Sequence, residues 1–423
     1  MYKKEATLIL TLIAGIMPLI MYPYGDDSYY LPKTIFLYVM CPLLIMILFL
    51  NRKKLIIDKK DVTLMFFILF VLISTFFSMD IIISVLGNEV RYEGLIMIIF
   101  YGIIYYTAKR YLIIDKKAIG FITVVAIIIA IYSIFQYYDI DPIPKDTYHA
   151  LINNNSIGTQ GNRNFLSTYI TLFLPIILGL YILKGRMKFL VAATILFSSL
   201  LCTLTRSGWL AFLIYSLIGL IYVIRKNNKS YLKRIGIILM IFTVVTVVIN
   251  ISTGGSITGR GEQFAKDAGT ISEYSGSGRI YIWDLAIKIT KAHPLLGSGP
   301  DTLKYVIEKE FKNEGIVWIQ EHNSVIDKAH NEFLQISSTM GIPALLAYLL
   351  FLILVINDNL RNIFKNEVSF LFGITIVGYL VQSFFNISVI NVAPLFWMLL
   401  GASNNIDVIR DLKNDLLINE AIK

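Results

Sequence analysis

The sequence carries little charge for its length. Only 16% of its 423 residues are charged, whereas 56% are hydrophobic. Soluble domains carry about 25% charged residues, so the composition excludes an ordinary soluble protein. The apolar residues form charge-free blocks such as 34–50, 118–136 and 165–183. Most of these blocks approach the roughly 20 residues that cross a membrane as a helix, and their unbroken character excludes the alternating pattern of a membrane β-barrel.

Cysteine is scarce as well. Cys41 and Cys202 both fall inside apolar blocks, and the sequence contains no CxxC or HExxH motif. These absences give no indication of a disulfide, and we predict neither a metal ion nor another cofactor. The predicted spans also lack Asp, Glu, Lys, Arg or His near their middles. Ion-driven transporters need such groups at membrane depth, so this class is disfavoured.

The net charge of +9 is unevenly distributed along the chain. Lysine and arginine concentrate in alternate short connections, 52–60, 109–117 and 225–234. The positive-inside rule places such connections in the cytoplasm. The basic balance therefore indicates membrane topology rather than a nucleic-acid partner. We expect a multi-pass protein of the cytoplasmic (inner) membrane, surrounded by membrane lipids, with both termini in the cytoplasm.

The predicted fold class is an all-α polytopic membrane protein with about 12 transmembrane helices. The first span is expected near 6–22 and the last near 389–404. The expected divisions are transmembrane helices 1–9 with short connections, a large helical extracytoplasmic loop, transmembrane helices 10–12 and a cytoplasmic tail, at 1–250, 251–340, 341–404 and 405–423.

Several helices are predicted within the extracytoplasmic loop. The Gly/Ser/Thr-rich stretch 252–261 is expected to be a flexible connection. An amphipathic helix is predicted over 279–292, with Ile280, Trp283 and Ile287 on its apolar face and Pro294 beyond its end. A second helix, capped by Asp301 or Thr302, is expected to extend to about 313. A third helix is predicted to begin near Asp327 and to carry His330. In that case Asp327 either caps the helix or orients the imidazole.

Charged residues gather at the outer ends of the predicted spans. Arg206 occupies a tight turn between two spans, Arg279 begins the loop helix, and His330 lies before the chain re-enters the membrane. The ordinary roles of such residues are contact with lipid head groups, for arginine, and a structural or exposed position, for histidine. Together, however, they suit a phosphate-bearing substrate at the lipid surface, because arginine binds phosphate oxygens bidentately and a neutral imidazole can accept a proton. Weaker candidates for substrate contacts are Arg163, Arg91, Glu93 and His322.

Five short motifs occur in a fixed order: GNRNFL at 161–166, LTRSGW at 204–209, GRIYIW at 278–283, PLLGSGP at 294–300, and AHNEFLQ at 329–335 followed by Gly341-Ile342. In order, spacing and position, these motifs resemble the O-antigen ligase and O-antigen polymerase superfamily. The family usually has proline where Arg163 stands, so no family role is transferred to Arg163.

The resemblance implies a C-type glycosyltransferase-like membrane fold and metal-independent, inverting transfer of a glycan from undecaprenyl diphosphate. By this resemblance, Arg206 and Arg279 bind the diphosphate leaving group, and His330 is the catalytic base toward the acceptor hydroxyl at an extracytoplasmic active site. An unperturbed imidazole would make the rate rise between about pH 6 and 7.

The acceptor stays open at this point. The superfamily includes ligases onto lipid A core, polymerases that extend a polysaccharide repeat unit, and oligosaccharyltransferases that modify protein hydroxyls. The Ile/Lys/Asn-rich composition suggests an AT-rich genome and favours a cell-wall glycan or a protein over a lipid core. A non-catalytic glycolipid flippase or exporter is the alternative from another class, but the charge-free spans disfavour the polar path that it would need.

Overall fold

Most of the chain that the structure describes is helical, and this part contains no strand. The computed structural model describes residues 2–24, 27–52, 56–89, 91–113, 115–141, 143, 156–269, 278–361 and 366–418. The first half contains α1 (Lys3–Gly15), η1 (Met17–Leu19), α2 (Leu31–Leu50), α3 (Lys59–Phe76), α4 (Ile81–Leu86), α5 (Leu95–Tyr111), α6 (Lys116–Tyr137), α8 (Arg163–Lys184), α9 (Met187–Cys202), α10 (Arg206–Lys226) and α11 (Lys229–Ser252).

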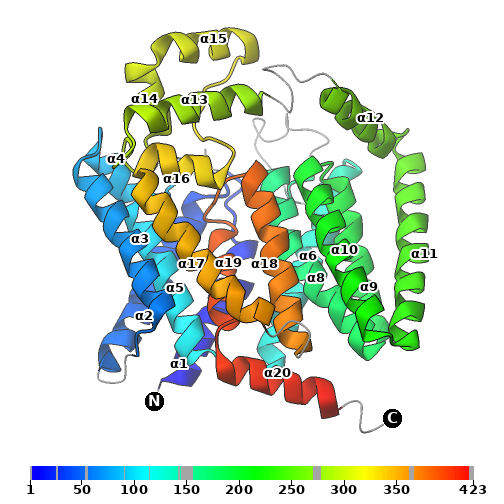
Figure 1. Ribbon diagram of the computed structural model, residues 1–423. Helices are drawn as coiled ribbons and strands as arrows, with labels where there is room; N and C mark the ends of the chain where they lie inside the picture. Colours follow the sequence, from blue (N-terminus) through cyan, green and yellow to red (C-terminus); the bar gives the residue numbers. More distant parts are fainter. Residues whose placement is uncertain are drawn as a thin grey trace.

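Five helices then precede a return to the bundle. They are α12 (Ser256–Gly269), α13 (Arg279–Ala292), α14 (Leu303–Glu310), α15 (Lys312–His322) and α16 (Glu332–Met340). The chain ends with α17 (Ile342–Arg361), α18 (Glu367–Phe385), α19 (Ala393–Ala402) and α20 (Ile406–Ile418). Figure 1 shows α13–α15 on one side of the bundle and both chain ends on the other.

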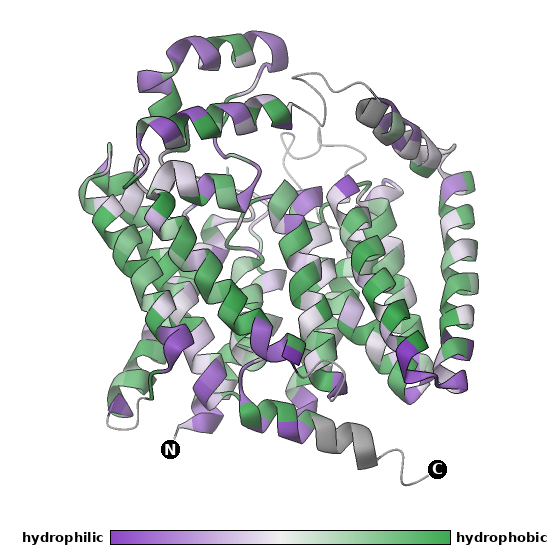
Figure 2. Cartoon of the chain, in the orientation of Figure 1, coloured by the Kyte–Doolittle hydropathy of each residue, from purple (hydrophilic) through white to green (hydrophobic). Residues whose placement is uncertain are grey.

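The all-helical, multi-pass character of the prediction is confirmed. Seven described helices are long and apolar enough to cross a membrane, namely α2, α6, α8, α10, α11, α17 and α18, and α9 and α19 are shorter apolar helices. Green apolar residues dominate the bundle, whereas purple residues are frequent on α13–α15 and at the ends of the helices (Figure 2). The last predicted span, 389–404, contains only the ten-residue α19. The total of about twelve spans stays a prediction.

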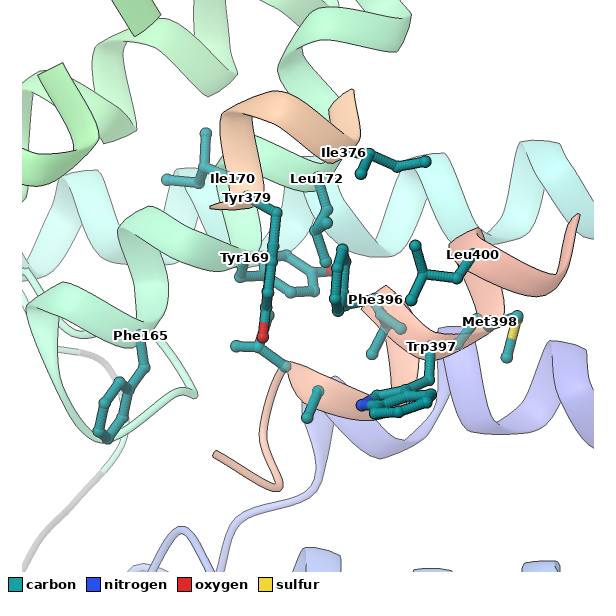
Figure 3. Close-up of a cluster of buried hydrophobic side chains, with 14 of the residues drawn as sticks. Phe165, Tyr169, Ile170, Leu172, Ile376, Tyr379, Phe396, Trp397, Met398 and Leu400 are labelled. Carbon is teal, nitrogen blue, oxygen red and sulfur yellow. The ribbon is translucent and has the colours of Figure 1, made fainter. Parts of the chain in front are cut away.

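The bundle is held together by aromatic and aliphatic side chains that meet between α8, α18 and α19 (Figure 3). Tyr379 of α18 stacks on Phe396 of α19 with ring centroids 3.6 Å apart. Above this core, Trp283 of α13 packs edge-on against Phe384 near the end of α18, with ring centroids 5.5 Å apart. Burial of such rings fixes α13 to the end of the bundle at which α18 ends.

The predicted amphipathic helix over 279–292 is confirmed as α13, but its buried face differs from the expected one. Ile282 and Ile289 are buried, whereas Ile280 and Ile287 are 36% and 41% exposed. The observed buried residues are offset by two positions along the helix from the expected ones, and both pairs have a spacing that fits a helix. The face that is buried is the one that packs against α14 and α16. The apolar periodicity of a single helix does not show which face its neighbours will cover.

Other expectations within the loop were wrong or incomplete. The stretch 252–261, expected to be flexible, contributes six residues to α12. The second predicted helix is present as α14, but α15 was not foreseen. The third begins at Glu332 rather than near Asp327, because the side chain of Asn331 caps it. His330 therefore precedes this helix instead of lying on it.

The positions of α11 and α12 allow the predicted topology to be tested. Residues 225–234 are expected inside because of their basic side chains, and α12 then lies outside, one helix later. A reporter that is active only outside the cytoplasm should be active when inserted after position 265 and silent when inserted after position 229. The reverse pattern would contradict the orientation and the extracytoplasmic site with it.

Candidate functional site

Three arginines are each the first residue of a helix. Arg163 begins α8, Arg206 begins α10 and Arg279 begins α13. The amino-terminal end of a helix carries partial positive charge and unpaired N–H groups, so a cation there is unfavourable unless an anion is present. The capping residues Thr205 and Gly278 supply no side-chain hydrogen bond to the starts of α10 and α13. These helix starts are therefore suited to binding an anion.

Arg279 lies at the centre of this positive charge. Burial, followed by the charges of Arg206, Arg260 and Arg163, lowers the pKa of Arg279 to about 10. Arg279 is still protonated at neutral pH, and three further guanidinium groups lie near enough to act on it. Such a cluster is stabilised when an anion binds, and the phosphate group matches the paired N–H donors of arginine.

The motif around His330 forms a tight turn that its own residues hold in place. The side-chain oxygen of Asn331 caps α16 by accepting two hydrogen bonds of 3.0 Å from N–H groups of the first helical turn. The side-chain oxygen of Gln335 accepts a hydrogen bond of 2.8 Å from the backbone N–H of Ala329. Between these anchors His330 has φ 48°, a left-handed conformation that few side chains adopt. Such conformations are frequent at functional sites.

The electrostatic environment of His330 connects it to the arginines. Burial, followed by the charge of Arg279, lowers the pKa of His330 to about 4, although Asp327 acts in the opposite direction. The imidazole is therefore neutral at pH 7 and able to accept a proton. Arg206 acts on Arg279, and Arg279 acts on His330, so the charges of the two predicted arginines and the predicted histidine are linked through Arg279.

Asp327 binds Arg91 rather than capping a helix. Arg91 donates from Nε to Asp327 Oδ2 at 2.7 Å, and its Nη2 lies 2.7 Å from the same oxygen. The guanidinium also lies over the rings of Tyr30 and Phe165, at 5.7 and 5.8 Å from their centroids. Burial alone would raise the pKa of Asp327, but Arg91 lowers it below its usual range. Arg91 thus connects the segment before His330 to the starts of α2 and α8.

The structure places Glu93 in a buried ionic network. Its carboxylate accepts hydrogen bonds from Tyr101 at 2.9 Å and Ser388 at 3.0 Å, and it lies 3.6 Å from Lys328 Nζ. Lys328 also pairs with Asp301 at 2.6 Å. All three charged side chains are buried, and together they fix the backbone two residues before His330. Glu93 is therefore positioned to support the turn from within.

A cavity of about 50 Å³ adjoins this network. Glu93, Tyr101, Lys328 and Glu332 are among its lining residues, but neither His330 nor any of the four arginines is. This volume suits a few water molecules and is far too small for a sugar. The arginine cluster and the cavity are separate features.

The ring of His322 stacks on that of Trp318, with centroids 3.7 Å apart. Both rings cover the start of α13. A Cβ atom on Gly278, which has φ 72°, would come within 2.5 Å of Trp318 and 3.3 Å of His322. The glycine before Arg279 thus allows α15 to close over the helix start. This stacking gives His322 a structural role and explains why the residue before Arg279 is glycine.

Asp139 and Asp141 are separated by one residue, which is the spacing of the Asp-x-Asp motif that can hold a metal ion. The carboxylate of Asp141, however, accepts hydrogen bonds from Tyr132 at 2.8 Å and from Gln136 at 3.2 Å. Across the described ranges, no group of three or more His, Cys, Asp or Glu side chains is arranged to hold a metal ion.

These features define a multi-pass helical membrane protein with a cluster of arginines and a neutral histidine in and beside its large loop. Residues 189–349 match the family model described as O-antigen ligase. This part of the chain is therefore similar to the O-antigen ligase family, and the resemblance to the O-antigen ligase and polymerase superfamily is confirmed. The matched range includes Arg206, Arg260, Arg279 and His330. No curated protein matches the chain.

Proposed function

We propose that the protein transfers a glycan from undecaprenyl diphosphate to an acceptor hydroxyl on the outer face of the cytoplasmic membrane. The observation that carries this proposal is the convergence of Arg206, Arg260 and Arg163 on Arg279, which in turn acts on a neutral His330. The cluster supplies charge for a diphosphate and the imidazole supplies a base, and residues 189–349 are similar to the O-antigen ligase family.

The proposed reaction is a single displacement at the anomeric carbon. The acceptor oxygen forms a bond to that carbon and gives its proton to the imidazole of His330. The bond from the anomeric carbon to the diphosphate oxygen breaks, and its electron pair leaves with undecaprenyl diphosphate. Arg206 and Arg279 stabilise the negative charge that develops on this leaving group. Attack opposite the leaving group inverts the configuration, and the arginines provide the charge that a metal ion would otherwise supply.

Incubation of purified protein with an undecaprenyl-diphosphate-linked glycan, with and without acceptors, tests this proposal. Gel electrophoresis and mass spectrometry should reveal a glycosylated acceptor. Extension of the donor glycan alone would identify a repeat-unit polymerase, and a modified Ser, Thr or Tyr would identify a protein oligosaccharyltransferase. Absence of product with every acceptor class would contradict transfer and favour a non-catalytic flippase or exporter.

The pH dependence of transfer should reflect the environment of His330. A base is active when deprotonated, so activity is lost as the pH falls through its pKa, which is about 4 here rather than the usual 6.5. We expect kcat/KM, which reports the free enzyme, to be flat between roughly pH 6 and 8. Bound diphosphate offsets the charge of Arg279, so the acid limb of kcat should lie at higher pH than that of kcat/KM.

The groups whose charges act on His330 are Arg279, Asp327, Arg91 and Lys328, and the profile reports their combined effect. Measurement of initial rates across pH, with folding checked at each value, tests this prediction. An acid limb near pH 6.5 in kcat/KM would mean that the imidazole is solvated like a free histidine, contrary to the burial in the structure.

A further inference from the structure

Helix α12 is fixed where it leaves the bundle. Gly254 and Gly255 have φ of 63° and 87° and reverse the chain after α11. The side-chain oxygen of Asn250 then accepts hydrogen bonds from the backbone N–H groups of Ile257 and Thr258, at 3.1 and 3.0 Å. Figure 1 shows α12 sloping from the top of α11 toward the side on which α13 lies. The orientation of α12 is therefore set at its first turn.

One face of α12 is directed inward. Ile257 and Arg260, three residues apart, are partly buried, whereas Thr258, Gly259 and Gly261 are exposed. A spacing of three residues places two side chains on the same face of a helix. Arg260 is therefore presented to the protein rather than to the surrounding water.

The guanidinium of Arg260 lies at the turn that carries Arg206. Its Nε donates to the carbonyl oxygen of Leu204 at 3.2 Å, and Leu204 has φ 50° immediately before the start of α10. Another of its nitrogens, Nη1, donates to Gln263 on the same helix. The charge of Arg260 also contributes to the lowered pKa of Arg279. Arg260 thus contacts the turn that precedes Arg206, and its charge reaches Arg279.

A neutral donor could make the hydrogen bond to Leu204 as well, so this bond alone does not account for a charged guanidinium near Arg206 and Arg279. A diphosphate has several charged oxygens, so it can accept hydrogen bonds from more than one guanidinium at once. Helix α11, from which α12 continues, is the least buried of the long apolar helices, so α12 lies at the lipid-facing edge of the molecule. A diphosphate attached to a membrane lipid would approach the cluster from this edge.

We propose that Arg260 is a further diphosphate-binding residue, which α12 brings to the cluster from the lipid-facing side. This inference rests on the proposed function. Arg260 binds the diphosphate of the donor lipid in the ground state, before the glycan is transferred. The same phosphate chemistry occurs in ordinary anionic head groups, and the experiment below separates the two sources.

Arg260→Ala should raise the KM for an undecaprenyl-diphosphate-linked glycan by about 10- to 100-fold, the range for loss of a hydrogen bond to a charged group. Its kcat should change by only a few fold, and Arg260→Lys should recover part of the affinity. Lys266→Ala is the matched control, because Lys266 is an exposed cation on the same helix, and this variant should keep the wild-type KM. Thermal unfolding in detergent with added undecaprenyl diphosphate gives a second measurement, in which Arg260→Ala should lose most of the stabilisation.

An unchanged KM in Arg260→Ala would overturn the inference. So would a fall in kcat alone, which would mean that Arg260 only positions the Arg206 turn through Leu204. Equal stabilisation of wild type by phosphatidylglycerol, with equal loss in Arg260→Ala, would assign the residue to head groups and overturn donor binding. If Arg206→Ala and Arg279→Ala were also fully active, the proposed function itself would fail, so the two failures are distinguishable.

Discussion

Replacing His330 by alanine is expected to lower the rate of glycan transfer by about 100- to 10,000-fold, the range for loss of a general base. The KM for the donor should change little, because the arginines and not the imidazole hold the diphosphate. His330 has φ 48°, and asparagine tolerates this left-handed conformation better than most residues. His330→Asn is therefore the sharper variant, since it removes the base with little effect on the turn. Initial rates with a lipid-linked glycan and an acceptor measure both effects.

His322→Ala provides the matched control. His322 stacks on Trp318 near the start of α13, and the variant should keep most of the activity while unfolding at a slightly lower temperature. If His322→Ala were inactive and His330→Asn active, the base would be His322, and its assignment to His330 would be wrong. If both variants were active at normal protein levels, the base-catalysed mechanism would have to be abandoned.

The bundle and α13 could be predicted because their signals are local. Apolar blocks reveal helices that face lipid, and the apolar periodicity of 279–292, followed by Pro294, predicts a helix that the structure contains as Arg279–Ala292. Arg206, Arg279 and His330 could be identified as candidate site residues because each lies at or near the end of a predicted helix. Their convergence on one another required the packing of α13 against α16 and the bundle, which a sequence pattern does not encode.

Helix α12 was missed for a physical reason. Its first residues are rich in Gly, Ser and Thr, which disfavour helices in isolation. Asn250, eight residues before Thr258, compensates by bonding the N–H groups that begin the helix. A search for capping residues directly before the helix does not find this cap, because Asn250 lies six residues before the helix begins. Arg260 was consequently assigned to a loop and escaped notice.

The roles of Asp301 and Asp327 also depended on partners distant in sequence. Asp301 was a reasonable helix cap by position, yet its carboxylate binds Lys328 and the backbone N–H of Asn88. Asp327 binds Arg91, more than two hundred residues earlier in the chain. Carboxylates at turns satisfy local and distant donors equally well, so spacing alone does not distinguish a cap from an ion pair.

The arginines at the starts of α10 and α13 lead to the second large expected effect. Arg206→Ala or Arg279→Ala should lower turnover by about 100- to 1,000-fold, the scale for losing one preorganised donor to a developing charge. Lysine at either position should restore only part of the rate, because it keeps the charge and loses the paired donors. The two effects should not add in the double variant, since both arginines stabilise one leaving group.

Turnover measured under saturating donor tests this expectation, with protein levels and thermal unfolding compared across the variants. Arg410→Ala is the control, because Arg410 is an exposed arginine on α20, near the carboxyl-terminal end of the chain, and this variant should be fully active. Thermal unfolding in the absence of donor shows whether each variant is folded. A variant that is inactive because it is unfolded would therefore be recognised. Full activity of Arg279→Ala at normal stability would mean that this arginine contacts lipid head groups or solvent, and that the diphosphate is bound elsewhere.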